Sequence, residues 1–318
     1  MTLRQYLLPV LLLLFGASEA GALTLEKIKY GDFNNWVTRT LNESKVLGGQ
    51  TKTVYAVGPT RSIKGNIPYK QGDSPWASSN VYAKVSGVVK TSNTVSPAIL
   101  NGNKVAKLET KMEHVKVLGL LNMDVMVTGT LFLGKIIEPI NTTKSPFSKM
   151  EMGIPYHKRP KALVFDYRID MPDVSTRVKS TGFGRKKTLP GRDQPEVYVL
   201  LQKRWEDAEG NIFAQRVGTA RERYSKPVPW TTGHQLPIHY GDISKEPWYK
   251  PWMGLLSGSK AYHAYNSKGK LVPVQEVGWA PESTTPTHAL VMASTTCGEP
   301  FIGTEGIVMY IDNIAFGF

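Results

Sequence analysis

Short runs in which apolar and polar residues alternate fill this chain, and helical periodicity is almost absent. Runs of this kind occupy residues 53–57, 85–90, 162–169, 196–202 and 212–217, and glycine, proline, asparagine or aspartate separates them. Alternation with a period of two places the apolar side chains on one face of a strand. Many short strands separated by turn residues predict an all-β protein, an antiparallel sandwich or barrel.

The last apolar run changes phase within its length. Apolar residues alternate in one phase over residues 307–311 and in the opposite phase over residues 314–318. An extra residue at Asp312-Asn313 accounts for both phases, so we expect a β-bulge there. A bulge leaves carbonyl groups unpaired beside the Asp312 carboxylate, and such oxygens suit a hard cation.

Two neighbouring runs differ in their expected place in a sheet. Residues 197–201 are apolar on both faces, which predicts a central strand. The next run, residues 212–217, carries Gln215 and Arg216, and we expect it nearer an edge. Gly210-Asn211 between the two runs predicts a hairpin turn.

Residues 1–22 are organised like a secretory signal peptide. Arg4 supplies a positive charge, residues 6–15 are apolar, and small residues follow, with cleavage expected after Ala20 or Ala22. An uncleaved anchor is the alternative, but an apolar core of about ten residues is short for a span of roughly twenty. We therefore expect an exported protein that has no transmembrane span after signal cleavage and folds as a single domain over residues 23–318.

The net charge is +13, and basic residues concentrate within residues 177–192, among glycines and prolines. The segment is predicted to be a solvated loop or, alternatively, to attract an acidic glycan or a negatively charged envelope surface. Nucleic acid is not expected as a partner, because no recognition motif is present. Cys297 is the only cysteine, so it forms no internal disulfide.

Several blocks in order resemble one bacterial family, the carbohydrate-metabolism domain of secreted Gram-negative proteins. The blocks are residues 32–36, 74–80, 106–110, 153–160 and 311–313. The resemblance implies a β-sandwich of the jelly-roll type, similar in shape to carbohydrate-binding modules. It also implies a location in the periplasm or at the cell surface of a Gram-negative bacterium.

The same resemblance implies a structural calcium ion. In such modules an acidic residue of the opening strand and an aspartate of the closing strand can share Ca²⁺. Carried over by position, Asp32 and Asp312 are the candidates. The alternative is that Asp312 only accepts hydrogen bonds from amides of the bulge.

Residues 242–281 form an insertion rich in aromatic residues, and it is the predicted ligand-binding region. Flat aromatic rings can stack on the C–H faces of a sugar, and a long loop on a rigid scaffold is a usual place for them. The candidates are Trp248, Tyr249, Trp252, Tyr262 and Tyr265, with Trp279 near the end of the insertion and Trp230 before it. The alternative is that these rings form a small core beneath the loop.

Asp166 and Asp170 are the weak candidates for catalysis, because both are predicted to lie on the polar face of one strand. They would be roughly 13 Å apart at about 3.3 Å per residue. Glycosidase carboxylate pairs lie about 5–9.5 Å apart. The alternative is a surface ladder in which Arg168 pairs with its neighbours.

These observations together predict a secreted carbohydrate-binding protein that recognises a polysaccharide or oligosaccharide through aromatic stacking. A glycoside hydrolase or lyase is one alternative, and an adhesion or structural module of the envelope is another.

Overall fold

The computed structural model describes residues 22–85, 87–117, 121–141, 146–182, 184–297 and 299–318. All but the last residue of the predicted signal peptide, residues 1–22, lies outside the described residues. The helical segments in the described part are short 3-10 turns: η1 (Lys45–Leu47), η2 (Pro146–Lys149), η3 (Pro251–Met253) and η4 (Gly258–Lys260). In the same part of the chain, no helix is long and apolar enough to cross a membrane.

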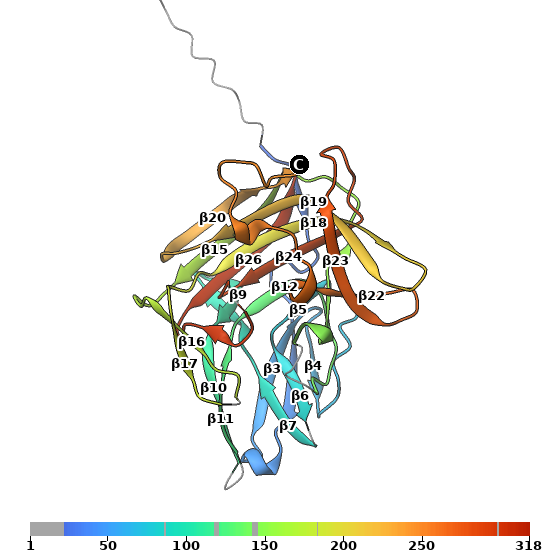
Figure 1. The fold of residues 1–318 in the computed structure, drawn as a ribbon. Coiled ribbons are helices and arrows are strands. Elements are labelled where there is room, and N and C mark those ends of the chain that lie inside the picture. Colours follow the sequence, from blue (N-terminus) through green and yellow to red (C-terminus); the bar gives the residue numbers. More distant parts are fainter. Residues whose placement is uncertain (1–21, 86, 118–120, 142–145, 183, 298) are drawn as a thin grey trace, which may run out of the picture.

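The first sheet of the fold has the C-terminal strand at its centre (Figure 1). Its order is β20-β15-β26-β9-β8, and β1 pairs with the last residues of β26. All of these pairings are antiparallel. The strands are β1 (Leu25–Lys27), β8 (Val95–Leu100), β9 (Asn103–Glu109), β15 (Ala162–Asp170), β20 (Val228–Pro237) and β26 (Val308–Gly317).

The second sheet is larger, and its strand pairings close into a circuit. The order is β14-β24-β18-β19-β23-β22-β13-β12-β5, with β21 also on β19, and β12 pairs with β24 as well as with β13. The strands are β5 (Trp76–Ser78), β12 (Thr130–Ile136), β13 (Met150–Met152), β14 (Ile154–Pro155), β18 (Glu196–Glu206), β19 (Ile212–Arg223), β21 (His239–Tyr240), β22 (His263–Tyr265), β23 (Leu271–Trp279) and β24 (His288–Ser294).

The two sheets pack face to face and enclose the main core. Phe165, Ile169 and Ile311 of the first sheet belong to one buried cluster with Val199 and Val291 of the second. Along the chain, β15, β20 and β26 alternate with strands of the second sheet, which is the crossing pattern of a jelly roll. The predicted all-β sandwich is therefore confirmed.

The β-bulge predicted in the closing strand is present. Val164 of β15 pairs with Ala315, and Asp166 pairs with Asp312, so β26 has one residue more than β15 over this interval. Asn313 has a positive φ of 52°, a backbone conformation that asparagine tolerates better than most residues. The extra residue that the change of phase requires is therefore accommodated at Asn313.

The predicted position of residues 212–217 is wrong, although the central place of residues 197–201 is confirmed. β18 lies between β24 and β19, and β19 is itself paired on its other edge with β23 and β21. Arg216 is fully buried because the carboxylate of Glu276, on β23, lies beside it. A buried partner on a strand that is adjacent in the sheet but distant in sequence thus allows a charged residue at a central position.

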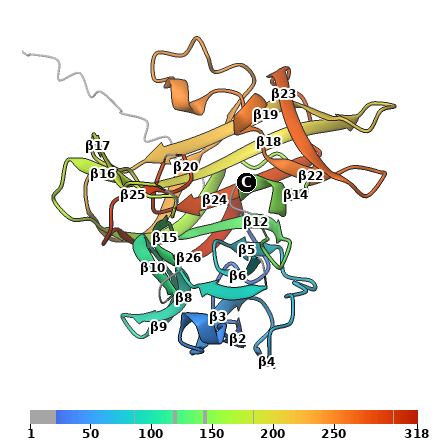
Figure 2. The same ribbon diagram turned by 60° about the horizontal axis from the view of Figure 1, so that its bottom comes forward.

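Small sheets extend from the sandwich, in the lower part of Figure 1 and towards the viewer in Figure 2. They are β3-β2-β4, β6-β7, β10-β11 and β17-β16-β25. Their strands are β2 (Trp36–Asn42), β3 (Thr51–Val57), β4 (Arg61–Lys64), β6 (Val81–Val85), β7 (Val88–Ser92), β10 (Lys111–Val117), β11 (Leu121–Val127), β16 (Thr176–Lys179), β17 (Lys187–Pro190) and β25 (Ile302–Gly303).

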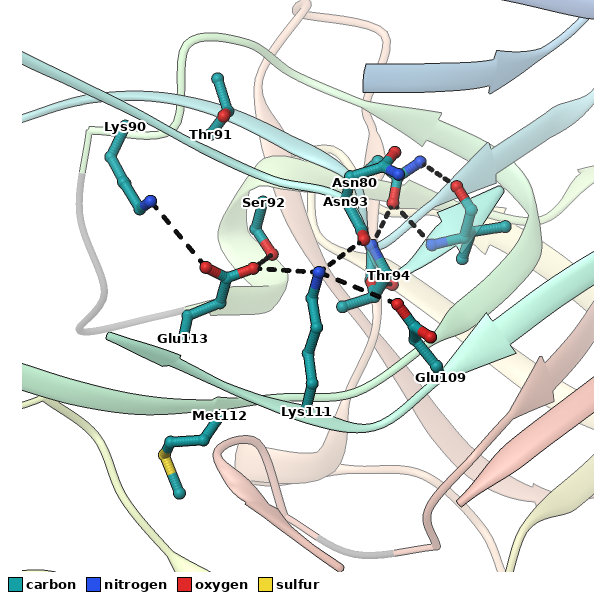
Figure 3. A network of polar contacts seen from close by, with 12 residues as sticks. Asn80, Lys90, Thr91, Ser92, Asn93, Thr94, Glu109, Lys111, Met112 and Glu113 are labelled. Carbon is teal, nitrogen blue, oxygen red and sulfur yellow. Dashed lines mark hydrogen bonds and ion pairs between the residues drawn. The ribbon is translucent and has the colours of Figure 1, made fainter. Parts of the chain in front are cut away.

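Asn80 joins the small sheet β3-β2-β4 to strand β8 of the sandwich (Figure 3). Its Nδ2 donates to the carbonyl oxygens of Tyr55 (2.8 Å) and Val95 (2.6 Å), and its Oδ1 accepts from the N–H groups of Thr94 and Val95 (2.8 Å each). Every hydrogen-bonding position of the buried amide is therefore used. Nearby, Lys111 Nζ donates to the carbonyl oxygen of Asn93 (3.0 Å).

Candidate functional site

A cleft of about 550 Å³ opens where the two ends of the aromatic insertion meet. It is lined by Tyr240, Gly241, Asp242, Glu246, Trp279, Ala280, Pro281 and Glu282, and we call it the junction cleft. It combines two aromatic side chains with three carboxylates, and no lysine or arginine is among the described residues that line it.

The junction cleft is built on one edge of β19. β23 runs parallel to the first half of β19 and ends at Trp279, whereas β21 runs antiparallel to the second half and ends at Tyr240. The carbonyl oxygens of Arg216 and Val217 accept hydrogen bonds from the N–H groups of Ala280 (2.9 Å) and Gly241 (3.0 Å), respectively. Adjacent residues of β19 therefore hold the two walls of the cleft.

The backbone of the cleft requires glycine at position 241. Gly241 has a φ of +80°, which only glycine adopts without strain. A Cβ at this position would also lie 3.5 Å from Cβ of Glu282 in the opposite wall. A separation of 3.5 Å is an ordinary van der Waals contact, so the conformation of the turn, and not lack of space, requires glycine here.

A buried ion pair fixes the wall that carries Trp279. Arg216 and Glu276 are fully buried, and Arg216 Nε donates to Glu276 Oε1 at 2.7 Å. Glu276 Oε2 also accepts from the N–H of Leu256 (2.6 Å), which ties the insertion to the sheet. The guanidinium carbon of Arg216 lies 5.7 Å from the centre of the Trp279 ring, so the ring rests on a rigid support.

The other aromatic side chain of the cleft is held as firmly. Tyr240 Oη donates to the carbonyl oxygen of Pro160 at 2.7 Å, and the guanidinium of Arg159 lies over its ring at 4.0 Å. Asp242 accepts a hydrogen bond from the N–H of Ser244 (2.9 Å), and hydrogen bonds from Ser244 lower the pKa of its carboxyl group. Asp242 is therefore an ionised acceptor at neutral pH.

Two of the predicted ligand-binding aromatics pack against the second sheet. Trp252 lies beneath the guanidinium groups of Arg221 (5.9 Å) and Arg223 (4.6 Å). Tyr262 is hydrogen-bonded through its hydroxyl to the hydroxyl of Tyr198 (2.5 Å). It packs against a smaller buried cluster that contains Tyr198, Phe132 and Leu200. These contacts show how the insertion covers the outer face of the second sheet.

The remaining predicted aromatics are more accessible. Trp248 is 37% exposed and lies on His239, with 4.2 Å between ring centres, so it is next to the cleft residue Tyr240. Tyr265, on β22, is 45% exposed. Tyr249 and Trp230 are half-buried, and neither is among the residues that line the junction cleft.

Three acidic residues that the sequence indicates as candidates, Asp32, Asp166 and Asp312, come from distant segments and lie close enough to interact. Asp166 and Asp312 are buried and face each other on β15 and β26. Asn313 Nδ2 donates to Asp166 Oδ2 (2.8 Å) and Asp312 Oδ2 (3.3 Å), and the N–H of Gly233 donates to Asp166 Oδ1 (2.6 Å). Burial, together with the negative charges of Asp166 and Asp32, raises the pKa of Asp312 to about 6.

Asp170 does not join this group. Its side chain is exposed, and its Oδ1 accepts a hydrogen bond from Arg168 Nε at 2.9 Å. The short surface ladder considered as an alternative for this strand is therefore present between Arg168 and Asp170. Asp166 instead accepts hydrogen bonds from Gly233 of β20 and Asn313 of β26.

The carboxylates at the predicted calcium site already accept hydrogen bonds from the protein. Ca²⁺ takes six to eight oxygen ligands. In the described parts of the chain, no group of three or more His, Cys, Asp or Glu side chains is arranged to hold a metal ion. Asp312 Oδ1 accepts from the N–H of Asn313 (2.9 Å), and Asp32 Oδ2 accepts from Asn34 Nδ2 (3.2 Å). Calcium at Asp32 and Asp312 stays a prediction.

The basic segment, residues 177–192, contains a β-hairpin where the sequence predicts a loop. β16 and β17 pair antiparallel, and β25 pairs with the other edge of β16. A hollow of about 640 Å³ on this sheet, here called the basic groove, is lined by Arg177, Lys179, Thr181, Arg185, Lys187, Leu189, Glu299 and Ile302.

Sequence reasoning identified the insertion but missed the acidic residues of the junction cleft. Asp242, Glu246 and Glu282 lie at the two ends of the insertion, where the chain leaves and rejoins the sheet. Carboxylates at both ends of an insertion are the available signal. That signal becomes informative only when both ends of the insertion are known to pair with the same strand, β19.

The fold is that of a β-sandwich protein with two surface hollows of opposite charge. The family described as "Putative carbohydrate metabolism domain" matches residues 54–224, and the chain belongs to this family. The match ends before the insertion. Membership of this family makes residues 54–224 a carbohydrate-related domain.

A solved structure from Bacteroides vulgatus ATCC 8482, whose title is that of a putative glycoside hydrolase, is similar to this chain. The similarity covers 92% of this chain and 94% of that chain, with 14% sequence identity and a TM-score of 0.41. A similarity of this strength supports no conclusion about function. No curated protein sequence matches the chain.

Proposed function

We propose that this protein binds an uncharged saccharide in the junction cleft. The observation that carries the proposal is the lining of the cleft, in which two fixed aromatic rings lie with three carboxylates. The C–H faces of a sugar stack on Trp279 and Tyr240, and its hydroxyl groups donate to Asp242, Glu246 and Glu282. A few polar groups placed in a concave, partly aromatic site are typical of ligand recognition.

The charge of the cleft selects the class of saccharide. Three carboxylates line it, with no cation among the described lining residues. A sugar that carries carboxylate or sulfate groups is repelled by this field, whereas a neutral sugar is not. The preferred ligand is therefore a neutral polysaccharide or oligosaccharide.

The environment of Asp242 favours binding over hydrolysis. Acid-catalysed cleavage requires a carboxyl group that is still protonated near the working pH. The pKa of Asp242 is lowered by its hydrogen bonds from Ser244, which suits an acceptor and not a general acid. Asp312 has a raised pKa, but it is buried and lies on the first sheet. We propose a binding protein that acts outside the cytoplasm.

The proposal is tested by calorimetry with neutral glycans that first bind the wild-type protein on a glycan array. Trp279→Ala should weaken binding at least tenfold, or about 1.4 kcal/mol. Trp205→Ala is the matched control, because Trp205 is 43% exposed, stacks on Phe213 and lies outside the cleft lining. Trp248→Ala and Trp252→Ala measure the contribution of the predicted aromatics.

Two results would overturn this assignment. One is the absence of binding to any neutral glycan by the wild-type protein. The other is equal weakening by Trp279→Ala and Trp205→Ala. Release of reducing sugar ends from a bound glycan would instead support the hydrolase alternative.

A further inference from the structure

The basic groove lies on one face of the small sheet β17-β16-β25. Lys179 of β16 pairs directly with Lys187 of β17, and Arg177 pairs with Leu189. On the other edge of β16, Ile302 of β25 pairs with Lys179. Residues that pair across strands have side chains on the same face, so the cations of β16 and β17 share the groove with Leu189, which is half-buried, and Ile302, which is buried.

This arrangement places like charges next to each other. Side chains opposite one another on antiparallel strands are about 5 Å apart, and two cations in such positions destabilise a sheet. Lys179 has an ion pair with Glu299 (3.2 Å), whose side chain is 74% exposed. Arg185 and Lys187 form no ion pair with any described residue. The repulsion within the groove is thus only partly relieved by the protein.

Neighbouring basic residues are neutralised elsewhere. Lys186 pairs with Asp124 of β11, and Arg192 pairs with Asp173. The unneutralised cations therefore belong to the groove and not to the segment as a whole. Arg177 adds a fixed donor, because its Nη2 donates to the carbonyl oxygen of Pro190 (3.2 Å), while its buried Nε has no hydrogen-bond partner among the residues that the structure describes.

We infer that the basic groove is a second binding site, for a glycan that carries carboxylate or sulfate groups. Arginine and lysine donors match such oxyanions, and removal of the repulsion between Lys179 and Lys187 adds to the binding free energy. The half-buried side chain of Leu189 offers a small apolar contact for the C–H face of a sugar ring beside the charged groups. The inference goes beyond the proposed function, because the junction cleft has the opposite charge and excludes such a glycan.

The two sites are far enough apart to be tested separately. In both Figure 1 and Figure 2 the β16–β17 hairpin lies on one side of the molecule, and β23, which ends at the junction cleft, lies on the other. A loss of binding in one site therefore need not affect the other.

The test measures binding of polygalacturonate, dextran sulfate and neutral dextran by immobilised wild-type protein at low and high salt. We expect binding of at least one charged polymer, no binding of dextran to the groove, and weakening by salt. Lys187→Gln should weaken binding about tenfold. Lys186→Gln removes the same charge one residue away, outside the groove lining, and should change it less than about twofold. Trp279→Ala should have no effect.

Equal weakening by Lys187→Gln and Lys186→Gln would overturn the inference, because it would indicate a diffuse basic surface. Absence of binding to both charged polymers would do the same. Vesicles of phosphatidylglycerol in phosphatidylcholine are a further probe, and capture by these vesicles without binding of charged polymers would also contradict a glycan site. None of these outcomes bears on the neutral-glycan experiment.

Discussion

Asp166 of β15 and Asp312 of β26 lie opposite each other on adjacent strands, and the side-chain amide of Asn313 donates a hydrogen bond to each carboxylate. The bulge therefore brings two acidic groups together and also supplies the donor between them. Asn313 can do so because its positive φ turns the chain at the extra residue. The cost of this arrangement should appear in the pH dependence of stability.

Asp312→Asn should stabilise the protein at pH 8 by about 2 kcal/mol and have little effect at pH 4. The folded-state pKa of Asp312 is about 6, above its ordinary value of 3.8. Between these values the folded state binds more protons than the unfolded state, so this group lowers stability as pH rises through that window. Urea unfolding at both pH values measures the difference.

Asp170→Asn is the matched control for Asp312→Asn, because Asp170 lies on the same strand as Asp166 but is exposed. It should change stability little at either pH. A gain from Asp312→Asn that is the same at pH 4 and pH 8 would contradict the electrostatic account.

Chelation should leave the melting temperature unchanged, because the carboxylates of Asp32 and Asp312 already accept hydrogen bonds from Asn34 and Asn313. The measurement is thermal unfolding with and without EDTA, followed by addition of Ca²⁺. A melting temperature that falls with EDTA and recovers with Ca²⁺ would support the calcium ion predicted at Asp32 and Asp312. In that case Asp312→Asn should destabilise the Ca²⁺-loaded protein.

Glu276→Ala should destabilise the fold by about 3–5 kcal/mol, because it leaves the buried guanidinium of Arg216 without its charge partner. Replacement of both residues, Arg216→Met with Glu276→Leu, should cost much less. Urea unfolding compares the two variants, with Glu282→Gln at the exposed rim of the cleft as the control. Similar losses for the single and double variants would argue against the ion pair as the cause.

Asn80→Ala should cost about 2–4 kcal/mol, since it removes four hydrogen bonds at a buried position and leaves their backbone partners unsatisfied. Asn66→Ala is the control, because Asn66 makes two similar bonds with the backbone of Asn42 but is exposed. Its replacement should cost less than about 1 kcal/mol. Thermal or urea unfolding that shows equal losses would contradict a special role for Asn80.

The bulge at Asp312-Asn313 could be predicted because the period of a strand is two, and one extra residue reverses every later side chain. The burial of Arg216 could not, because its partner Glu276 lies 60 residues away and on a parallel neighbour. The hairpin of β16 and β17 was hidden by the glycines and prolines around it. Its strands are only four residues long.

The candidate site was only partly within reach of the sequence. Aromatic composition located the insertion, but the junction cleft depends on β21 and β23 both pairing with the same edge of β19. Such end-to-end pairing is a property of the assembled sheet. Trp279 could therefore be seen as an aromatic residue of the insertion but not as the wall of a cleft.

The central place of β26 also has a consequence for how the chain reaches its native state. β15 and β9 pair with β26 on opposite edges, and both strands precede β26 in the sequence, so they are synthesised before the partner that they share. A nascent chain that lacks these residues has two unpaired strand edges in the middle of the first sheet, and such edges are prone to aggregate. The first sheet therefore stays open at its centre until β26 has been synthesised, and the chain is most prone to aggregate before that point.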